Sequence, residues 1–378
     1  MTPGGEPPEL ESAFGTVGSR DPGLRAAVEA ALAPEATGKS TPIGLIGCGW
    51  IAGMQLAAYR ERGLNVVALS DRNLDRAIDY RDKYYPDAAV YADLSELLEH
   101  PGLEVIDIAT HVNGREAIVL DGIRAGKHVL SQKPFVEKLT TGRMLAQAAS
   151  EAGVILAVNQ NGRWAPHFGA MLALVRQGLI GEVLSADFSV SWSHDLIVKD
   201  MPAFASMDDL ILFDFGAHWF DLIGLLAPPG GLEVRATTSR RLGQAISAPT
   251  QANVLISGED FAGSLTFRGS ERFAERGSFR ISGTRGVITQ SGTSLAGRSI
   301  GLENESGSAT IQTGEDWFSH GLGGAMVALL HAVENHCLPP HSAASALRGL
   351  EFCFAALASA RTGLPVAAGE STGRIGGQ

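Results

Sequence analysis

The sequence predicts an α/β fold: a parallel sheet covered by helices on both faces, followed by a second region built on an antiparallel or mixed sheet. Two observations predict it. From residue 43 to residue 161, continuous apolar runs alternate with amphipathic helical segments, which is typical of a buried parallel sheet. Beyond Arg163, strand-like runs separated by Gly, Ser or Asp follow one another without helices between them, which is typical of antiparallel or mixed pairing.

The first region contains six expected strands, and a helical pattern follows each of the first five. The expected strands are 43–47, 65–71, 88–93, 104–110, 128–134 and 154–161. The expected helices are 52–63, 73–84, 94–100, 113–126 and 140–153. Because ligands of such sheets bind at the carboxyl ends of the strands, polar residues at those ends are the first candidates for a site.

The second region begins with a helical pattern at 171–181 and a long strand pattern at 183–192. Segment 210–227 is helical in its second half. The strand-like runs that follow are 232–240, 251–258, 261–269, 277–284 and 286–292. Two helices, 324–336 and 342–361, close the chain.

The chain has 378 residues, of which 45% are hydrophobic, and this length favours two domains. We place a dinucleotide-binding domain at 41–163 and a second domain, for substrate binding and oligomerisation, at 164–378. Residues 1–40 are rich in Pro, Gly and Glu and hold one short helical pattern, 21–33. We expect them to form a flexible extension, or an arm that packs on a partner, outside either core.

Composition excludes several classes of protein. The net charge is −11, and the only basic cluster is a pair of arginines at 240 and 241, so we expect no nucleic-acid binding. No apolar run approaches the length of a membrane span, and the N-terminus does not resemble a secretory signal. Three cysteines far apart in the sequence fit a reducing compartment. We therefore expect a cytoplasmic protein, and we expect no metal site.

The run GLIGCGWIAG places Gly47, Gly49 and Ala52 at the spacing G-x-G-x-x-A, between an apolar strand and a helix. The first glycine allows a tight turn, the second lets a pyrophosphate approach, and the small third residue lets helix and strand pack closely. Trp50 and Ile51 follow at the helix N-terminus, where unpaired N–H groups favour phosphate. A Gly-rich turn alone is a weak signal, but its place at the first strand of the series strengthens it.

The second expected strand ends in Asp71, which could accept hydrogen bonds from both hydroxyls of an adenosine ribose. The alternative is an N-cap for the next helix, although Asn73 could fill that role. Arg72 follows directly and could pair with a 2′-phosphate instead. NAD is therefore slightly favoured over NADP, and both remain open.

Lys133 lies at the end of the fifth expected strand, directly before Pro134. It should therefore share the carboxyl-end crevice with Gly47 and Asp71. The proline restricts the backbone of Lys133 to extended values, which holds the ammonium in one direction. The alternative is a structural ion pair.

The run FDFGAHWFD spaces Asp214, His218 and Asp221 at i, i+4 and i+7, which places them on one face of a helix. The alternative for a lone Asp and His is a helix cap and a buried core histidine. Three ionisable groups among Leu, Ile, Phe and Trp are costly unless they are paired or used. Three other candidates, Asn159, Asn161 and Arg163, close the sixth strand and could line a cofactor, a substrate or the domain junction.

From residue 42 to the end, the sequence resembles the glucose–fructose oxidoreductase and inositol dehydrogenase group, the Gfo/Idh/MocA family. The stretches that carry the resemblance are IGLIGCGWIA, ALSDRN, GIRAGKHVLSQKPF, VNQNGRWAP, DFGAHWFD, RISGTRGVI and ALASARTGLPV. The resemblance implies a Rossmann domain, a doubly wound parallel sheet, followed by an α+β domain with a large open mixed sheet that is mostly antiparallel. It also implies NAD or NADP, a sugar, polyol or inositol-like substrate, and a homodimer or homotetramer formed through that sheet.

The family's catalytic lysine falls on Lys133, and its Asp–His pair falls on Asp214 and His218. The motifs above, together with the resemblance, give the expected binding residues. For the cofactor these are Gly47, Gly49, Trp50, Ile51, Asp71, Arg72, Thr110, Gln132 and Asn161. For the substrate they are Lys133, Arg163, Trp164, Asp214 and His218.

The sequence departs from the family's pattern in two motifs. Gln132 replaces the glutamate before the catalytic lysine, which removes one negative charge. After Thr110, His111 replaces a proline and Arg115 replaces a histidine. Both changes lie near the expected nicotinamide side.

The predicted function is a dehydrogenase or reductase that moves a hydride between a nicotinamide and a carbinol carbon. In it His218 is the general base, Asp214 orients the imidazole or binds a neighbouring hydroxyl, and Lys133 donates to the developing alkoxide. Two alternatives remain. One is an NAD-dependent enzyme that oxidises C3 of a glycoside transiently and then eliminates a substituent. The other is a dinucleotide-binding protein without catalysis.

Overall fold

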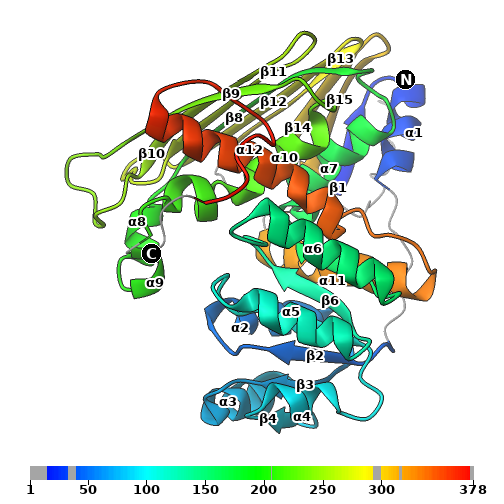
Figure 1. Ribbon diagram of the computed structural model, residues 1–378. Helices are drawn as coiled ribbons and strands as arrows, with labels where there is room; N and C mark the ends of the chain where they lie inside the picture. Colours follow the sequence, from blue (N-terminus) through cyan, green and yellow to red (C-terminus); the bar gives the residue numbers. More distant parts are fainter. Residues whose placement is uncertain (1–14, 33–39, 206, 293–298, 315–316, 375–378) are drawn as a thin grey trace.

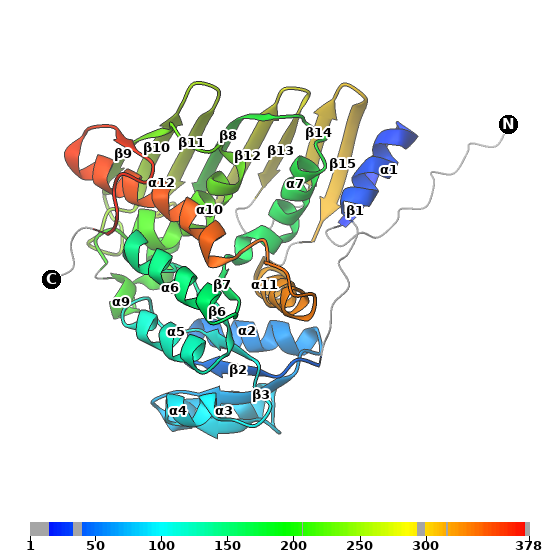
Figure 2. The same ribbon diagram turned by 45° about the vertical axis from the view of Figure 1, so that its right-hand side comes forward.

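The computed structural model describes residues 15–32, 40–205, 207–292, 299–314 and 317–374. It contains a six-stranded sheet and a ten-stranded sheet, with helices packed between and around them (Figure 1, Figure 2).

The six-stranded sheet is parallel throughout and has the order β4-β3-β2-β5-β6-β7. Its strands are β2 (Ile43–Ile46), β3 (Val66–Ser70), β4 (Ala89–Tyr91), β5 (Val105–Ile108), β6 (His128–Gln132) and β7 (Leu156–Asn159). Its helices are α2 (Trp50–Glu61), α3 (Leu74–Tyr84), α4 (Leu94–Leu98), α5 (Arg115–Arg124) and α6 (Leu139–Glu151). The order reverses between β2 and β5, as in the Rossmann fold, so the predicted doubly wound sheet is confirmed.

The ten-stranded sheet has the order β1-β15-β14-β13-β12-β8-β11-β10-β9-β16. Its neighbours are antiparallel except for β11 and β8, which run parallel. Its longer strands are β8 (Val183–Ser191), β9 (Glu233–Ser239), β10 (Gln251–Ser257), β11 (Ala262–Arg268), β12 (Arg276–Gly283), β13 (Gly286–Gly292), β14 (Ser299–Asn304) and β15 (Gly307–Thr313). The short β16 (Val366–Ala367) completes one edge. The predicted mixed, mostly antiparallel sheet is therefore confirmed.

Burial alternates along the strands of the large sheet, so one face of the sheet forms the core. That face is covered by α7 (Pro166–Arg176), α10 (Ala217–Leu226) and α12 (Ala343–Thr362), as both views show. By length and composition α12 could also span a membrane, but 67% of its apolar window is buried inside the protein. Its apolar character is therefore explained by its place in the core.

The expectation for the N-terminal extension is wrong for its described part. Residues 15–32 form β1 (Gly15–Ser19), which pairs with β15 at the sheet edge, and α1 (Pro22–Ala31). Leu24, Val28 and Leu32 recur at four-residue spacing and are buried in the large core, which explains why this segment folds against the protein. Residues 1–14 and 33–39 lie outside the described residues.

Five further elements of the described residues lie between the sheets or connect them. They are a 3₁₀-helix (Asn161–Trp164), α8 (His194–Val198), α9 (Pro202–Ala205), a π-helix (Ile211–Phe215) and α11 (Trp317–Glu334). The expected helix within 210–227 therefore divides into the π-helix and α10. The helix α11 packs on α2 and on one face of the parallel sheet. A helix from the second half of the chain therefore completes the hydrophobic core of the first half.

Candidate active site

The glycine turn leads from β2 into α2 at the carboxyl end of the parallel sheet. Gly47 has φ +92°, and a Cβ there would lie 2.8 Å from Thr110 Cγ2, so only glycine fits. A Cβ at Gly49 would meet nothing within 4 Å, which leaves open space beside the turn. No described side chain caps the N-terminus of α2, where Trp50 is the first helical residue. These helical N–H groups can therefore bind a pyrophosphate.

Asp71 lies beside the same turn. Its carboxylate accepts hydrogen bonds from the backbone N–H of Cys48 at 2.7 Å and of Asn73 at 2.8 Å. Asn73 is the N-cap of α3, accepting from Asp75 N, so Asp71 does not serve as that cap. Arg72 is exposed. A carboxylate at this place can accept further hydrogen bonds from ribose hydroxyls.

Several polar atoms at the carboxyl ends of β5, β6 and β7 are buried without a hydrogen-bond partner among the described residues. They are Thr110 Oγ1, Ser131 Oγ, Gln132 Nε2, and both amide atoms of Asn159. Unpaired buried polar atoms are costly, and a cluster at strand ends is where a polar ligand binds. Amide donors and acceptors, with hydroxyls, fit the carboxamide and ribose of a nicotinamide nucleotide.

Lys133 of the first region meets Asp214 of the second. Its ammonium donates to Asp214 Oδ1 at 3.1 Å and to the Asp214 carbonyl oxygen at 3.2 Å. The side chains are 18% and 10% exposed, so the pair is largely shielded from water. Asp214 lies in the π-helix, an irregularity that frequently occurs at functional sites.

His218, in the first turn of α10, belongs to the same cluster. Its Nδ1 is buried without a partner in the described chain, and its ring packs on Trp317 with centroids 5.3 Å apart. Burial lowers the pKa of His218 well below its ordinary value, and the positive charge of Lys133 lowers this pKa further. The imidazole is therefore neutral at neutral pH and able to accept a proton.

Arg115, which departs from the family's histidine, fixes the backbone on both sides of Lys133. The buried guanidinium donates to the carbonyl oxygens of Gln132 and of Pro134, the latter at 2.6 Å. It also donates twice to the Thr110 carbonyl, once through Nε at 3.1 Å. Burial lowers the pKa of Arg115 to about 9, which leaves it cationic at neutral pH. Arg115 therefore joins the ends of β5 and β6 around the lysine.

Gln132, the second departure, also acts locally. Its Oε1 accepts a hydrogen bond from the Lys133 N–H at 2.7 Å, while its Nε2 is among the unpaired buried atoms. The side-chain amide thus supports the lysine backbone and leaves its NH₂ group to donate to a ligand.

The prediction that Arg163 binds substrate is not supported by its contacts. Its guanidinium pairs with Asp221 at 2.7 Å and 2.5 Å, and also donates to Ser345 Oγ at 3.0 Å and to the Pro340 carbonyl. Every guanidinium nitrogen is therefore used within the protein. Asp221 is correspondingly paired with Arg163 and does not join Asp214 and His218. The helical spacing predicts that Asp214, His218 and Asp221 share one face of a helix, but it cannot show that Asp221 is paired with Arg163.

The contacts of Asn161 and Trp164 also differ from the prediction. The Oδ1 of Asn161 accepts a hydrogen bond from Trp317 Nε1 at 2.7 Å. Trp164 packs edge-on against His341 with centroids 4.7 Å apart, and against Gly324 of α11. Both residues therefore contribute to the domain junction, which was the alternative reading of this stretch.

His194 is a further residue of the cluster, and from the sequence it could contact a substrate hydroxyl or simply be exposed, as could Trp192, Asp195 and Lys199. Burial lowers its pKa to about 4, and the charges of Asp214 and Lys133 act on it in opposite directions. Both of its ring nitrogens are buried without a partner in the described residues. The sequence left both possibilities open, because the path of the chain between β8 and the π-helix depends on tertiary contacts.

Comparison with protein families gives two matches along the chain. Residues 42–160 match the model of the Gfo/Idh/MocA oxidoreductase family with an NAD-binding Rossmann fold, and residues 168–289 match that family's C-terminal domain. The chain belongs to the Gfo/Idh/MocA family. It is therefore an oxidoreductase that binds NAD or NADP, and its residues at the strand ends fit such a cofactor.

Two curated relatives are named D-apiose dehydrogenase. The protein from Rhizobium rhizogenes is 28% identical over 251 residues, covering 65% of this chain and 71% of the relative. The protein from Paraburkholderia graminis is 30% identical over 216 residues, covering 57% and 56%. A scyllo-inositol 2-dehydrogenase (NADP⁺) from Bacillus subtilis is 28% identical over 36% of this chain and 38% of its own length.

Solved structures share the fold over most of the chain. An oxidoreductase from Agrobacterium radiobacter, in complex with NAD⁺, L-tartaric acid and magnesium, superposes with a TM-score of 0.77 at 22% identity, covering 87% of this chain and 98% of the other. A levoglucosan dehydrogenase in complex with NADH and levoglucosan has a TM-score of 0.74 at 18% identity, covering 87% and 100%.

Proposed function

We propose that this protein moves a hydride between a nicotinamide and a secondary hydroxyl or ketone of a sugar, polyol or inositol-like compound. One observation carries the proposal: the ammonium of Lys133 lies 3.1 Å from the carboxylate of Asp214, in the same cluster as the neutral imidazole of His218. This cluster combines a hydrogen-bond donor, an acceptor and a base. Oxidation of a carbinol requires all three beside the reacting carbon.

Each residue then has a role. The bound nicotinamide dinucleotide supplies the hydride acceptor or donor. His218 accepts the hydroxyl proton, since its neutral ring has a free nitrogen lone pair. Lys133 donates a hydrogen bond to the oxygen as negative charge develops, which is worth about 3–4 kcal/mol for one such donor in a shielded site. Asp214 holds the ammonium in position and can accept from a second substrate hydroxyl.

NAD is the favoured cofactor. The carboxylate of Asp71 lies at the glycine turn, where it can accept from both ribose hydroxyls and would repel a 2′-phosphate. Asp71→Ala should weaken NAD far more than NADP in a binding titration. An equal loss for both would show that Asp71 only supports the turn.

The substrate class is supported by the polar character of the cluster and by the relatives, which are named for sugars and a cyclitol. Tests of Lys133→Ala and His218→Ala should show turnover reduced by about 10²-fold or more, with dinucleotide binding retained. The assay is a panel of sugars, polyols and inositols with NAD and with NADP, followed by NADH or NADPH absorbance. Near wild-type turnover in either variant would reject the role assigned to that residue.

We also propose that copies of the chain associate through the uncovered face of the large sheet, and that the protein acts in the cytoplasm. Leu255 on that face is 59% exposed, and its cross-strand neighbours are Arg235 and Ser264. Leu255→Glu should shift the sedimentation coefficient toward that of a single chain. An unchanged coefficient in a protein that forms oligomers would place the contact elsewhere.

A further inference from the structure

His194 is a histidine whose hydrogen-bonding groups are unused. It begins α8, directly after Trp192 and Ser193 at the end of β8. Both ring nitrogens are buried, and neither has a partner among the residues the structure describes. A neutral imidazole carries one donor and one acceptor, so two polar groups are shielded from water without compensation. Such a cost is expected where a ligand supplies the missing partners.

The surroundings distinguish His194 from the other buried histidines. His341 is also buried, but it packs on Trp164 at the domain junction, and a hydrogen bond with the backbone of Ala325 acts on its pKa. The ring of His194 instead packs on Phe215, next to Asp214, with centroids 4.6 Å apart. Its pKa responds to Asp214, Lys133 and Asp195, and its charge in turn acts on His218. His194 therefore belongs to the cluster of the proposed active site.

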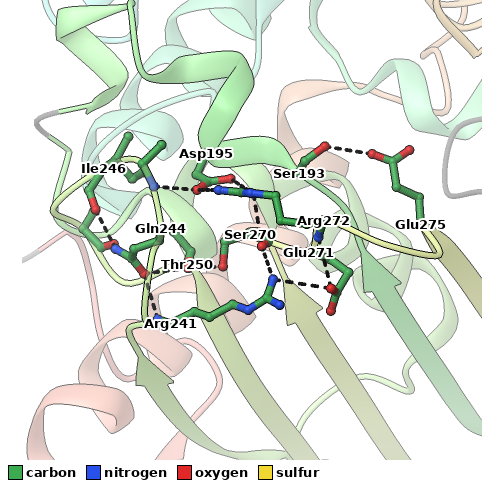
Figure 3. Close-up of polar contacts among 12 residues, drawn as sticks. Ser193, Asp195, Arg241, Gln244, Ile246, Thr250, Ser270, Glu271, Arg272 and Glu275 are labelled. Atoms are coloured by element: carbon green, nitrogen blue, oxygen red, sulfur yellow. Dashed lines mark hydrogen bonds and ion pairs between the residues drawn. The ribbon is translucent and has the colours of Figure 1, made fainter.

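A polar network fixes the backbone that carries His194 (Figure 3). The next residue, Asp195, is fully buried and accepts two hydrogen bonds from Arg272, at 2.7 Å and 2.6 Å. Asp195 also accepts from the Ala245 N–H at 2.7 Å, and its own N–H donates to the Gly269 carbonyl at 3.0 Å. The imidazole is thereby held by a rigid support, as binding residues need to be.

The network extends beyond Asp195. Figure 3 shows Ser193 donating to Glu275 at 2.9 Å, and Arg241 pairing with Glu271 at 3.3 Å. The loops between β9 and β10 and between β11 and β12 therefore anchor the segment on both sides of His194. In contrast, the imidazole itself takes no part in the network.

We propose that His194 recognises a second hydroxyl of the substrate, next to the carbinol that is oxidised, so that the preferred substrates are vicinal diols. A hydroxyl both donates and accepts, and so matches a neutral imidazole. The carboxylate of Asp214 in the same cluster disfavours an anionic group at that place. The proposal rests on the proposed function, with Lys133 and His218 acting on the first hydroxyl and His194 on its neighbour.

The test compares alcohols that differ by one hydroxyl. The NAD-loaded wild type and His194→Phe are assayed with cyclohexanol and with cis- and trans-1,2-cyclohexanediol. We expect wild type to favour a diol by about tenfold or more in kcat/KM, and the phenylalanine variant to lose most of that preference. His194→Asn, which keeps a donor and an acceptor, should recover part of it. A preference unchanged in His194→Phe would overturn the proposal, as would equal activity of wild type on all three alcohols.

His341→Phe is the matched control, since it removes a buried imidazole outside the cluster. It should leave the diol preference unchanged, and the same loss there would overturn the specific role of His194. If wild type oxidises none of the alcohols, the proposed function is put in doubt separately. The NADH-loaded wild type is then titrated with the diols while the imidazole NMR signals are followed: a shift of the His194 signal supports the proposal, and no shift overturns it.

Discussion

Replacement of Arg115 by methionine should lower both stability and turnover. The methionine side chain fills much of the same volume as the arginine. It lacks the N–H groups with which Arg115 donates to the carbonyl oxygens of Thr110, Gln132 and Pro134. These carbonyls lie at the ends of two parallel strands, on both sides of Lys133. The change therefore affects the position of the Lys133 ammonium without touching it.

The magnitude follows from the three carbonyls. Each buried acceptor left without a donor costs about 1–3 kcal/mol. Removal of a buried cation offsets part of this, because its desolvation no longer opposes folding. We expect a net loss of about 3 kcal/mol in the free energy of unfolding. A displacement of about 1 Å at a reacting group can cost about 100-fold, so kcat/KM should fall by about that factor.

Urea unfolding and steady-state kinetics measure the two effects. Arg124→Met is the control, since Arg124 lies on the same helix and is 71% exposed in a surface ion pair. That control should change stability by about 0.5 kcal/mol or less. Arg115→Lys keeps a charge but has a single donor group, so it should recover only part of the loss. Wild-type stability and kinetics in Arg115→Met would refute the reasoning.

Three further predictions concern ionisable groups. Burial raises the pKa of Asp107 to about 7, from 3.8. The native state therefore binds a proton that the unfolded state releases, and this group's contribution to stability falls between about pH 4 and pH 7, by up to about 4 kcal/mol. Asp107→Asn should remove this pH dependence and should therefore be more stable than wild type at pH 8. Urea unfolding at pH 4 and at pH 8 measures the free energy of unfolding of both proteins. An equal pH dependence in the two proteins would contradict the prediction. Arg163→Met should cost about 3–5 kcal/mol, because it leaves Asp221 buried and unpaired, and calorimetry should show recovery when Asp221→Leu is added. Lys133→Met should raise the pKa of His218 in an NMR titration while leaving it below its ordinary value, since burial is the larger cause; no change would show that the two groups are not coupled.

The parallel sheet and its site could be predicted because the relevant signals are local. Apolar runs give the strands, and the end of a parallel strand fixes the edge at which Gly47, Asp71 and Lys133 lie. The four-residue spacing of Asp214 and His218 likewise gives a shared helical face. The meeting of Lys133 with Asp214 was inferred from the family resemblance, since 81 residues separate them.

Other contacts could not be predicted, because each joins two residues that are far apart in the sequence, and no local pattern indicates which residues will pair. Asn161 bonds to Trp317 and Arg163 to Asp221, so two polar residues that resembled ligand-binding groups instead join the domains. Strands β14 and β15 go beyond the predicted elements, because their runs SIGLEN and GSATIQT contain few apolar residues. Their pairing with β13 and β1 stabilises them where local propensity does not.

The helix α11 has a consequence for how the two halves can be separated. Leu322, Met326 and Leu329 on this helix share a core with Leu45 and Leu69 of the parallel sheet. A fragment ending near residue 163 would expose that apolar surface, and such a fragment should be insoluble or bind the remainder of the chain in trans. During synthesis, the cofactor-binding half should reach its final stability only after residues 317–334 have left the ribosome.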